Sequence, residues 1–212
     1  MKTFVLALAC ITITACDGNN SSVENQRLPW DIQSDTAGET AVFGINPGKI
    51  TLREFALHFH ELADVRLFQK PNGDLFLEAY LGKIRLGKFD ARLVAELDAP
   101  DALLQSVLAS NKNRTPTPNN YWQYNLNDQQ LLEALEQRVW RFMYIPIADY
   151  EEKQVGFFGE PESVRKASDT AEYRFYPQKG FAMLWDKAGK ETFYYASPSE
   201  FGRLKVAIEN DR

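Results

Sequence analysis

The sequence predicts an α+β fold made of two tandem small units, each with helices packed on one face of an antiparallel sheet. Between residues 42 and 212, helical patterns of 3.6-residue period alternate with short strand-like runs bounded by Gly, Pro and Asn. Similar segments recur at a nearly constant offset, since Phe59 is matched by Phe158, 99 positions later. With 44% hydrophobic and 13% aromatic residues, the chain can bury a core.

The N-terminus has the pattern of a signal peptide. Lys2 supplies a positive charge, and a largely apolar run covers residues 4–15. This run is too short to span a bilayer, which needs ~20 apolar residues, but it suits the core of a signal peptide. It ends in Ile13-Thr14-Ala15-Cys16, which resembles the lipobox of bacterial lipoproteins. The resemblance implies a signal peptide over residues 1–15, removed by cleavage, and attachment of lipid to Cys16.

Two alternatives stand beside this interpretation. Residues 7–10 (Ala-Leu-Ala-Cys) form a weaker competing site, because Ala replaces the branched aliphatic residue and the apolar run continues beyond it. The other alternative is an ordinary signal peptide that happens to contain cysteine. Both cysteines lie in this leader, so no disulfide is expected in the body. We expect the protein in the cell envelope, lipid-anchored and facing the periplasm, and the resemblance of Asp17 to an enteric retention signal favours the inner membrane.

The residues after Cys16 predict a tether and then the first unit. Residues 16–41 are rich in Asn, Ser, Asp and Gly without periodicity, which is typical of a flexible tether. The first α+β unit is expected over 42–110. It should contain a helix from Thr51 to Glu61, with Phe55 and Phe59 on its apolar face, and a helix from an Asp101 N-cap to about 109. Strands are predicted between these helices at 64–69, 74–81, 83–87 and 90–97.

A linker and the second unit follow. Residues 111–120 (NKNRTPTPNN) have the composition of a linker, and the second α+β unit is expected over 121–212. An amphipathic helix at 128–138 belongs to this unit or bridges the pair. Other helices are predicted from an Asp149 N-cap to Phe158 and from Ser197 to about Ile208. Strands are predicted at 140–145, 163–167, 171–176, 181–186 and 191–195.

The second unit carries a family resemblance. Gln154-Val155, then Phe158-Gly159-Glu160-Pro161, and later Phe181 to Asp186 before a Gly-Lys turn are similar to the small outer-membrane lipoprotein A / BamE family and to the related β-lactamase-inhibitor-type fold. The resemblance covers about fifty residues here and extends faintly to the first unit, where His60-Glu61-Leu62 replaces Gly-Glu-Pro. It implies small helix-on-sheet units that bind other proteins and catalyse nothing. These motifs are turn and core residues, so they indicate fold rather than function.

The chain offers little recognisable chemistry. It has no catalytic or nucleotide-binding motif among the common ones, and neither a cofactor nor a metal is expected. His58 and His60 are two residues apart on a predicted helix, so they point in different directions and cannot share one ion. The formal net charge is −5 without a basic run, which argues against nucleic acid as a partner and against electrostatic binding to anionic lipid.

Aromatic residues are the best candidates for a binding surface. Trp140, Phe142 and Tyr144 alternate along one predicted strand and should share a face, while adjacent Tyr194 and Tyr195 should face opposite ways. Most such side chains fill cores, but Trp and Tyr are also over-represented at interfaces. The partner-binding candidates are Trp140, Phe142, Trp185 and Tyr194.

We therefore expect an envelope-anchored, non-enzymatic protein. Its partners would be the lipid bilayer, through acylated Cys16, and another envelope protein bound through a sheet face. One alternative is an envelope hydrolase or small-ligand-binding protein with a pocket between the two units. Another is a structural role in spacing the envelope, in which no single residue would matter.

Overall fold

The computed structural model describes residues 28–34, 39–111 and 113–210, so the predicted signal peptide and Cys16 lie outside the described residues. The described residues form a mixed α/β fold with five α-helices, three 3-10 helices and a ten-stranded sheet. The helices are α1 (Leu52–Phe59), α2 (Asp101–Ser110), α3 (Asp128–Leu135), α4 (Glu152–Val155), α5 (Phe201–Asn210), η1 (Gly156–Phe158), η2 (Pro177–Lys179) and η3 (Pro198–Glu200).

The sheet is continuous and antiparallel throughout, with the strand order β6-β7-β3-β4-β5-β8-β12-β11-β10-β9. Its strands are β3 (Asp64–Gln69), β4 (Leu75–Leu86), β5 (Phe89–Leu97), β6 (Thr115–Pro116), β7 (Trp122–Asn125), β8 (Val139–Pro146), β9 (Ser163–Lys166), β10 (Ala171–Tyr176), β11 (Phe181–Asp186) and β12 (Thr192–Ala196). A separate ribbon pairs β1 (Gln33–Ser34) with β2 (Thr40–Ala41). Because β5 pairs directly with β8, the two halves of the chain share one sheet rather than forming one sheet each.

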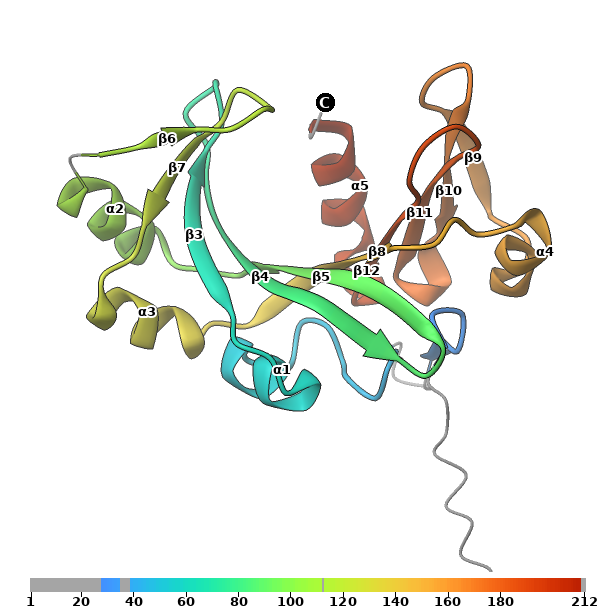
Figure 1. The fold of residues 1–212 in the computed structure, drawn as a ribbon, viewed down its shortest axis with the longest axis horizontal. Helices are drawn as coiled ribbons and strands as arrows, with labels where there is room; N and C mark the ends of the chain where they lie inside the picture. The colour runs from blue at the N-terminus through green and yellow to red at the C-terminus, as the bar shows by residue number, and fades with distance from the viewer. Residues whose placement is uncertain (1–27, 35–38, 112, 211–212) are drawn as a thin grey trace, which may run out of the picture.

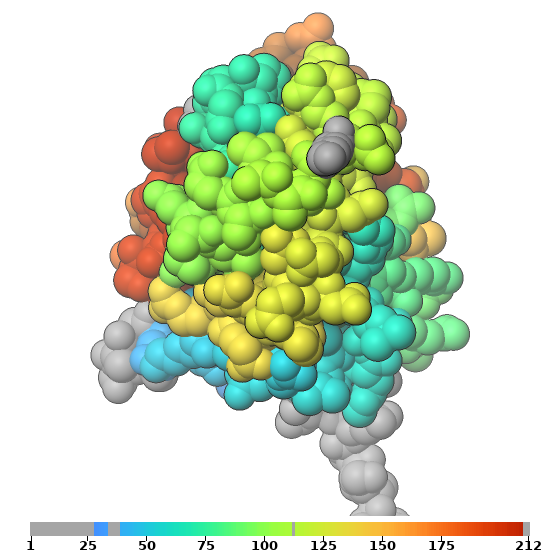
Figure 2. Space-filling model, turned by 90° about the vertical axis from the view of Figure 1, so that its left-hand side faces the viewer, coloured from blue at the N-terminus to red at the C-terminus, as the bar shows by residue number. Residues whose placement is uncertain are grey.

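The sheet bends around α5, with β3 and β7 on one side of this helix and β9, β10 and β11 on the other (Figure 1). We call the face that α5 covers the inner face and the opposite face the outer face. Helices α1, α2 and α3 lie side by side over the outer face of the N-terminal half (Figure 2). Helix α4 and η1 lie on the same outer face in the C-terminal half, where Phe158 stacks on Phe181 at 4.7 Å.

One hydrophobic core lies along the outer face beneath both halves. Its aromatic centre comes from β8, from β12 and from the segment before α1. Phe142 stacks on Tyr195 at 4.9 Å, and Phe43 stacks on Tyr144 at 5.5 Å. A smaller core on the inner face joins α5 to β8, β10, β11 and β12. The two halves are therefore held together by shared packing as well as by the β5–β8 ladder.

The segment predicted as the end of the tether is packed on the body. Pro29 is buried, and its carbonyl oxygen accepts a hydrogen bond of 2.9 Å from the Tyr195 hydroxyl. Trp30 contacts four aromatic rings, and Thr40 is buried and donates to the Lys179 carbonyl. The body thus begins by Leu28, earlier than the expected boundary at residue 42, because an aromatic site on the outer face holds Trp30 in place.

Most strand predictions are confirmed, including β3 and β11 to the residue. The predicted strands at 74–81 and 83–87 are instead one strand, β4. Its register shifts between Tyr80 and Gly82, where Gly82 has φ +78°, so a β-bulge accommodates the glycine that the sequence suggested as a break. The predicted linker at 111–120 contains the short edge strand β6, and β7 follows it.

Helix starts differ from the predictions in two places. Pro100 occupies the N-cap position of α2 and Asp101 is its first helical residue. Helix α4 begins after a Glu151 N-cap rather than at Asp149. Asp149 forms an ion pair with Lys190 instead, and Tyr150 is buried with its N–H donating to Glu191 at 3.2 Å. At α1, by contrast, Thr51 forms a capping box with Glu54, and its hydrogen bonds lower the pKa of that carboxyl.

Candidate functional site on the inner face of the sheet

A row of charged side chains crosses the inner face of the N-terminal half. The strand register aligns Arg66 on β3 with Glu78 on β4, and Glu78 with Glu96 on β5. Glu96 in turn lies opposite Arg141 on β8. Like charges directly opposite each other are unfavourable in a sheet, so an arginine on each side of the two glutamates offsets their repulsion. The row places two carboxyl groups side by side, which the sequence alone did not indicate.

The row ends in a largely buried ion pair at β8. Arg141 is 3% exposed, and its Nε donates to Glu96 Oε2 at 2.8 Å. The Trp140 indole N–H donates to the other oxygen, Oε1, at 3.1 Å. Both groups reach one carboxylate because the β5–β8 register shifts between Glu96 and Leu97. This bulge places Trp140 and Arg141 next to each other on the inner face.

At the opposite end of the row, aromatic rings form a small cluster near the β3–β4 turn. Phe68 stacks on Phe76 at 5.4 Å, and Tyr121 meets Phe76 edge-on at 6.0 Å. The Lys70 ammonium lies 5.5 Å from the centre of the Phe76 ring. All three rings are half-buried, so they offer apolar contact area while remaining accessible.

The middle of this surface is open. Tyr80 is 42% exposed and lies opposite Val94, which is half-buried. On the other side of β5, Val94 lies opposite Met143 on β8. We call Arg66, Phe68, Phe76, Glu78, Tyr80 and Val94 the inner-face strip. It combines apolar, aromatic and charged groups, the mixture found at protein–protein interfaces.

The partner-binding residues predicted from the sequence are buried in this structure. Phe142 is fully buried in the outer-face core, and Trp140 and Tyr194 lie on the inner face in the core beneath α5. Trp185 is buried on the outer face, with the Arg174 guanidinium 4.1 Å from its ring centre. Tyr194 and Tyr195 face opposite ways, as predicted, since they belong to the inner and outer cores. Trp140 does not share a face with Phe142, because the bulge beside it interrupts the alternation.

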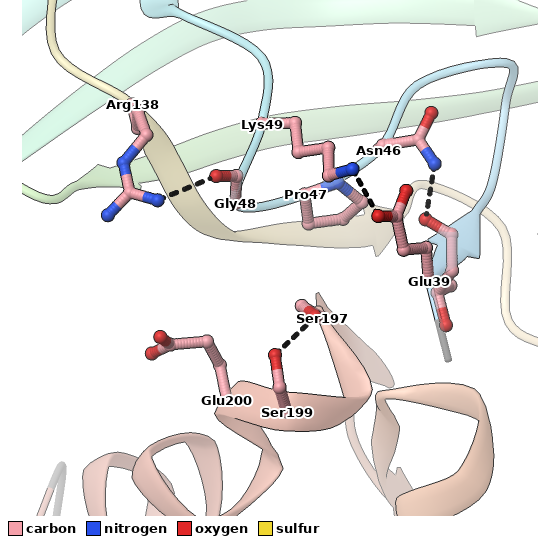
Figure 3. Close-up of a pocket in the computed structure, with 10 residues that line it drawn as sticks. Glu39, Asn46, Pro47, Gly48, Lys49, Arg138, Ser197, Ser199 and Glu200 are labelled. Carbon is pink, nitrogen blue, oxygen red and sulfur yellow. Dashed lines mark hydrogen bonds and ion pairs between the residues drawn. The ribbon is translucent and has the colours of Figure 1, made fainter. Parts of the chain in front are cut away.

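A polar cavity of about 290 Å³ lies between the loop before α1 and η3 (Figure 3). Arg138 donates to the Gly48 carbonyl at 3.0 Å and also pairs with Asp98. Lys49 pairs with Glu39. Ser197 and Ser199 hydrogen-bond each other at 2.8 Å, as Figure 3 shows. Since both cations are paired with carboxylates of the protein, the cavity offers little unbalanced charge to a ligand.

The histidines do not approach one another as metal ligands. His58 Nε2 lies 2.9 Å from the Phe43 carbonyl oxygen, while His60 is the C-cap residue of α1 with φ 55°. Among the described residues, no group of three or more His, Cys, Asp or Glu side chains could hold a metal ion.

Searches against protein-family models, curated proteins and solved structures find no match to this chain. Within the described part of the chain, none of the helices combines the length and the apolar character needed to cross a membrane.

Proposed function

We propose that this chain is a bacterial lipoprotein, anchored through acylated Cys16 on the periplasmic side of a membrane, whose body binds another envelope protein. The lipobox-like Ile13-Thr14-Ala15-Cys16 supports the anchor. The observation that carries the binding role is the difference in cover on the inner face. Helix α5 buries this face in the C-terminal half. In the inner-face strip none of the described helices covers Tyr80, which is exposed, and Phe68, Phe76 and Val94 are only half-buried.

The chemistry of the strip favours a protein partner. Tyrosine and phenylalanine provide contact area with little loss of side-chain entropy, and Arg66 and Glu78 can fix the register of a bound segment through charge. Arg66 is itself held by Asn125 at 2.7 Å and by Asp64 at 2.8 Å, so it is oriented before a partner arrives. Such preorganisation lowers the entropic cost of binding.

The test is a pull-down from mildly crosslinked, detergent-solubilised membranes with three versions of the intact lipidated protein. The wild type is compared with Tyr80→Asp, which places a charge in the strip. Leu132→Asp is the matched control, since Leu132 is 54% exposed on α3, away from the inner face. We expect a specific envelope protein to co-purify with the wild type and the control and to be lost with Tyr80→Asp. Equal recovery with all three would contradict a role for the strip.

A Cys16→Ala variant tests the anchor separately. We expect the wild type in the membrane fraction and the variant in the soluble periplasmic fraction. Recovery of both proteins in the soluble fraction would exclude the lipoprotein interpretation.

An envelope hydrolase or a sugar-binding protein is the second candidate. Glu78 and Glu96 lie opposite each other on adjacent strands, and paired carboxylates are the usual apparatus of glycoside hydrolysis. Against this, Glu96 already accepts hydrogen bonds from Trp140 and Arg141. Cell-wall fragments that raise the melting temperature of the wild type but not of Glu78→Gln would favour this candidate, because a ligand stabilises the state it binds.

We also propose that the two halves descend from one duplicated unit, as the tandem pattern and the family resemblance suggest. In each half a helix precedes an antiparallel meander and a second helix follows it: α1, β3 to β5 and α2, and then α4, β9 to β12 and α5, where the second meander has one strand more. The second helices pack on opposite faces of the sheet, α2 on the outer face and α5 on the inner face. The proposed copies therefore differ in the face that their last helix covers.

A further inference from the structure

The point where the chain enters the body is fixed by aromatic packing. The centre of the Trp30 ring lies 5.0 Å from that of Phe157 on η1 and 5.7 Å from that of Phe89, the first residue of β5. It also meets Tyr150 edge-on at 6.2 Å. With the hydrogen bond between the Pro29 carbonyl and Tyr195, these contacts hold the start of the body beside the β4–β5 hairpin and η1.

Apolar side chains are exposed around this entry point. Phe157 is 51% exposed, and Ile147 is 37% exposed. The Ile147 N–H donates to the Asp90 carbonyl at 2.9 Å, which places Ile147 beside the start of β5. We call Trp30, Phe89, Ile147 and Phe157 the entry patch. Exposed Phe and Ile around a half-buried Trp match the composition of surfaces that lie at a membrane interface.

Two lysines near the entry patch are paired within the protein. Lys83 lies 2.8 Å from Asp90, which lowers the pKa of that carboxyl, and Lys190 pairs with Asp149. Lys88 and Lys153 are also exposed near the patch. Three exposed carboxylates on the same segments offset their charge, so the surface presents no strong cationic field to anionic lipid; they are Asp31, Glu151 and Glu152. Any attraction to a bilayer would come from apolar contact.

As a random coil, the sequence between Cys16 and Leu28 would keep the entry point closer to the bilayer than the far side of the body. Eleven residues lie between the two positions, and the twelve Cα–Cα steps would span ~20 Å as a random coil and at most ~40 Å when fully extended. A domain of this size has a radius of gyration of ~16 Å, so its far side lies well over 30 Å from its near side. A lipid on Cys16 would hold the entry patch close to the bilayer at a high effective concentration, and even a weak contact would then be populated.

We propose that the entry patch is a second membrane contact, with Phe157 and Ile147 inserted among the lipid headgroups. This inference rests on the lipid attachment in the proposed function. It fixes the orientation of the body, because η1, which carries Phe157, lies on the outer face while α5 covers the inner face.

The test uses a fluorescent reporter on the full, lipidated chain. After cleavage the mature chain contains one cysteine, Cys16, whose sulfur carries the lipid, so an introduced cysteine is the single site for a thiol-reactive NBD dye. The reporter positions are Phe157→Cys and, as a second variant, Ile147→Cys. Val206→Cys is the matched control, since Val206 is 56% exposed on α5. Each protein is reconstituted into phosphatidylcholine vesicles, with and without nitroxide-labelled lipid.

We expect the nitroxide lipid to quench the dye at positions 157 and 147 several-fold more than at position 206. The dye emission at these two positions should shift to the blue on reconstitution, and raising the salt concentration should leave both effects unchanged. If the labelled proteins float with the vesicles but all three positions are quenched equally, the entry patch is not a membrane contact, although the anchor stands. If the unlabelled wild type does not float, or if its own cysteine reacts with the dye, the lipid attachment itself is wrong.

Discussion

The inner face of the sheet differs sharply between its two halves. In the C-terminal half it is apolar and buried beneath α5. The residues there are Trp140, Tyr173, Phe175, Ala182, Tyr194 and Ala196, covered by Phe201, Leu204 and Ile208. In the N-terminal half the same face carries the inner-face strip and the charged row. One sheet thus uses one face for internal packing in one half and presents it to solvent in the other.

The boundary between these regions lies at β8. The bulge beside Trp140 sets two consecutive side chains on one face, so Trp140 joins the buried cluster and Arg141 joins the charged row. Arg203 on α5 spans the boundary, with its guanidinium 3.9 Å from the Trp140 ring centre and 3.2 Å from Asp98. A single extra residue in one strand therefore separates a structural surface from a proposed binding surface.

The largest predicted effect is a loss of folding stability at alkaline pH, because the single core on the outer face contains buried tyrosines and lies beneath both halves. Burial raises the pKa of Tyr144 to about 12 and also raises the pKa values of Tyr150 and Tyr195. Above pH 10 the unfolded chain releases protons that the folded chain retains, so stability falls as pH rises. Burial also raises the pKa of Tyr176, but less strongly. The three most strongly shifted tyrosines give a slope of about 4 kcal/mol per pH unit between pH 10 and 12, comparable to the whole stability of a domain.

Circular dichroism against pH should therefore show both halves unfolding in one transition below pH 12. Tyr150→Phe is the matched control, and it should reduce the slope by about a third. Two separate alkaline transitions would show that the halves fold independently and would contradict the view that one core holds them together.

The next largest effect is expected at the boundary. Arg141→Ala leaves Glu96, whose side chain is only 12% exposed, without its arginine. It should lower the free energy of unfolding by about 3 kcal/mol, measured by urea denaturation. Arg203→Ala removes the more exposed arginine of the same region and should cost under about 1 kcal/mol. Similar losses for the two variants would mean that the buried pair is not what stabilises the boundary.

Weakening the packing of α5 on the inner face of the C-terminal half should lower the free energy of unfolding by a similar or slightly smaller amount. Leu204 is fully buried between α5 and the sheet, so Leu204→Ala should cost about 3 kcal/mol through lost burial and the cavity left behind. Val206→Ala, on the exposed side of the same helix, provides the control and should change stability by less than about 0.5 kcal/mol. A loss below about 1 kcal/mol for Leu204→Ala would indicate that α5 is only loosely attached, and the inner face would then be open in both halves.

The strands were predictable because their signals are local. The runs at 64–69 and 181–186 alternate apolar and polar residues or are bounded by turn residues, and both form strands with those limits. The α1 start was equally local, since Thr51 and Glu54 form the capping box within four residues. The predicted start of α4 was wrong because long-range partners, Lys190 and Glu191, engage the residues that would have started it.

The candidate site was not predictable, because it depends on pairings distant in sequence. Glu96 and Arg141 are 45 positions apart, and no local pattern indicates that β5 and β8 are neighbours. Alternation placed Trp140 with Phe142, and one bulge reversed that assignment. Tyr80 carries no sequence signal that separates it from core aromatics, since its exposure depends on which half α5 covers.

Replacing Tyr80 is expected to have the smallest effect on stability, although it should have the largest effect on binding of the proposed partner. Tyr80 is 42% exposed, so Tyr80→Ala should change the free energy of unfolding by less than about 0.5 kcal/mol. The same variant should reduce co-purification of the envelope partner about tenfold or more, since a buried interface tyrosine often contributes over about 1.4 kcal/mol to binding. Tyr194→Ala, in the covered half of the same face, should instead lower stability by a few kcal/mol, because Tyr194 lies in the α5 core. The two tyrosines share one face of one sheet, so measuring stability and co-purification for both variants separates the structural half from the proposed binding half. Loss of stability with Tyr80→Ala, or undiminished co-purification, would mean that the open half is not a binding surface.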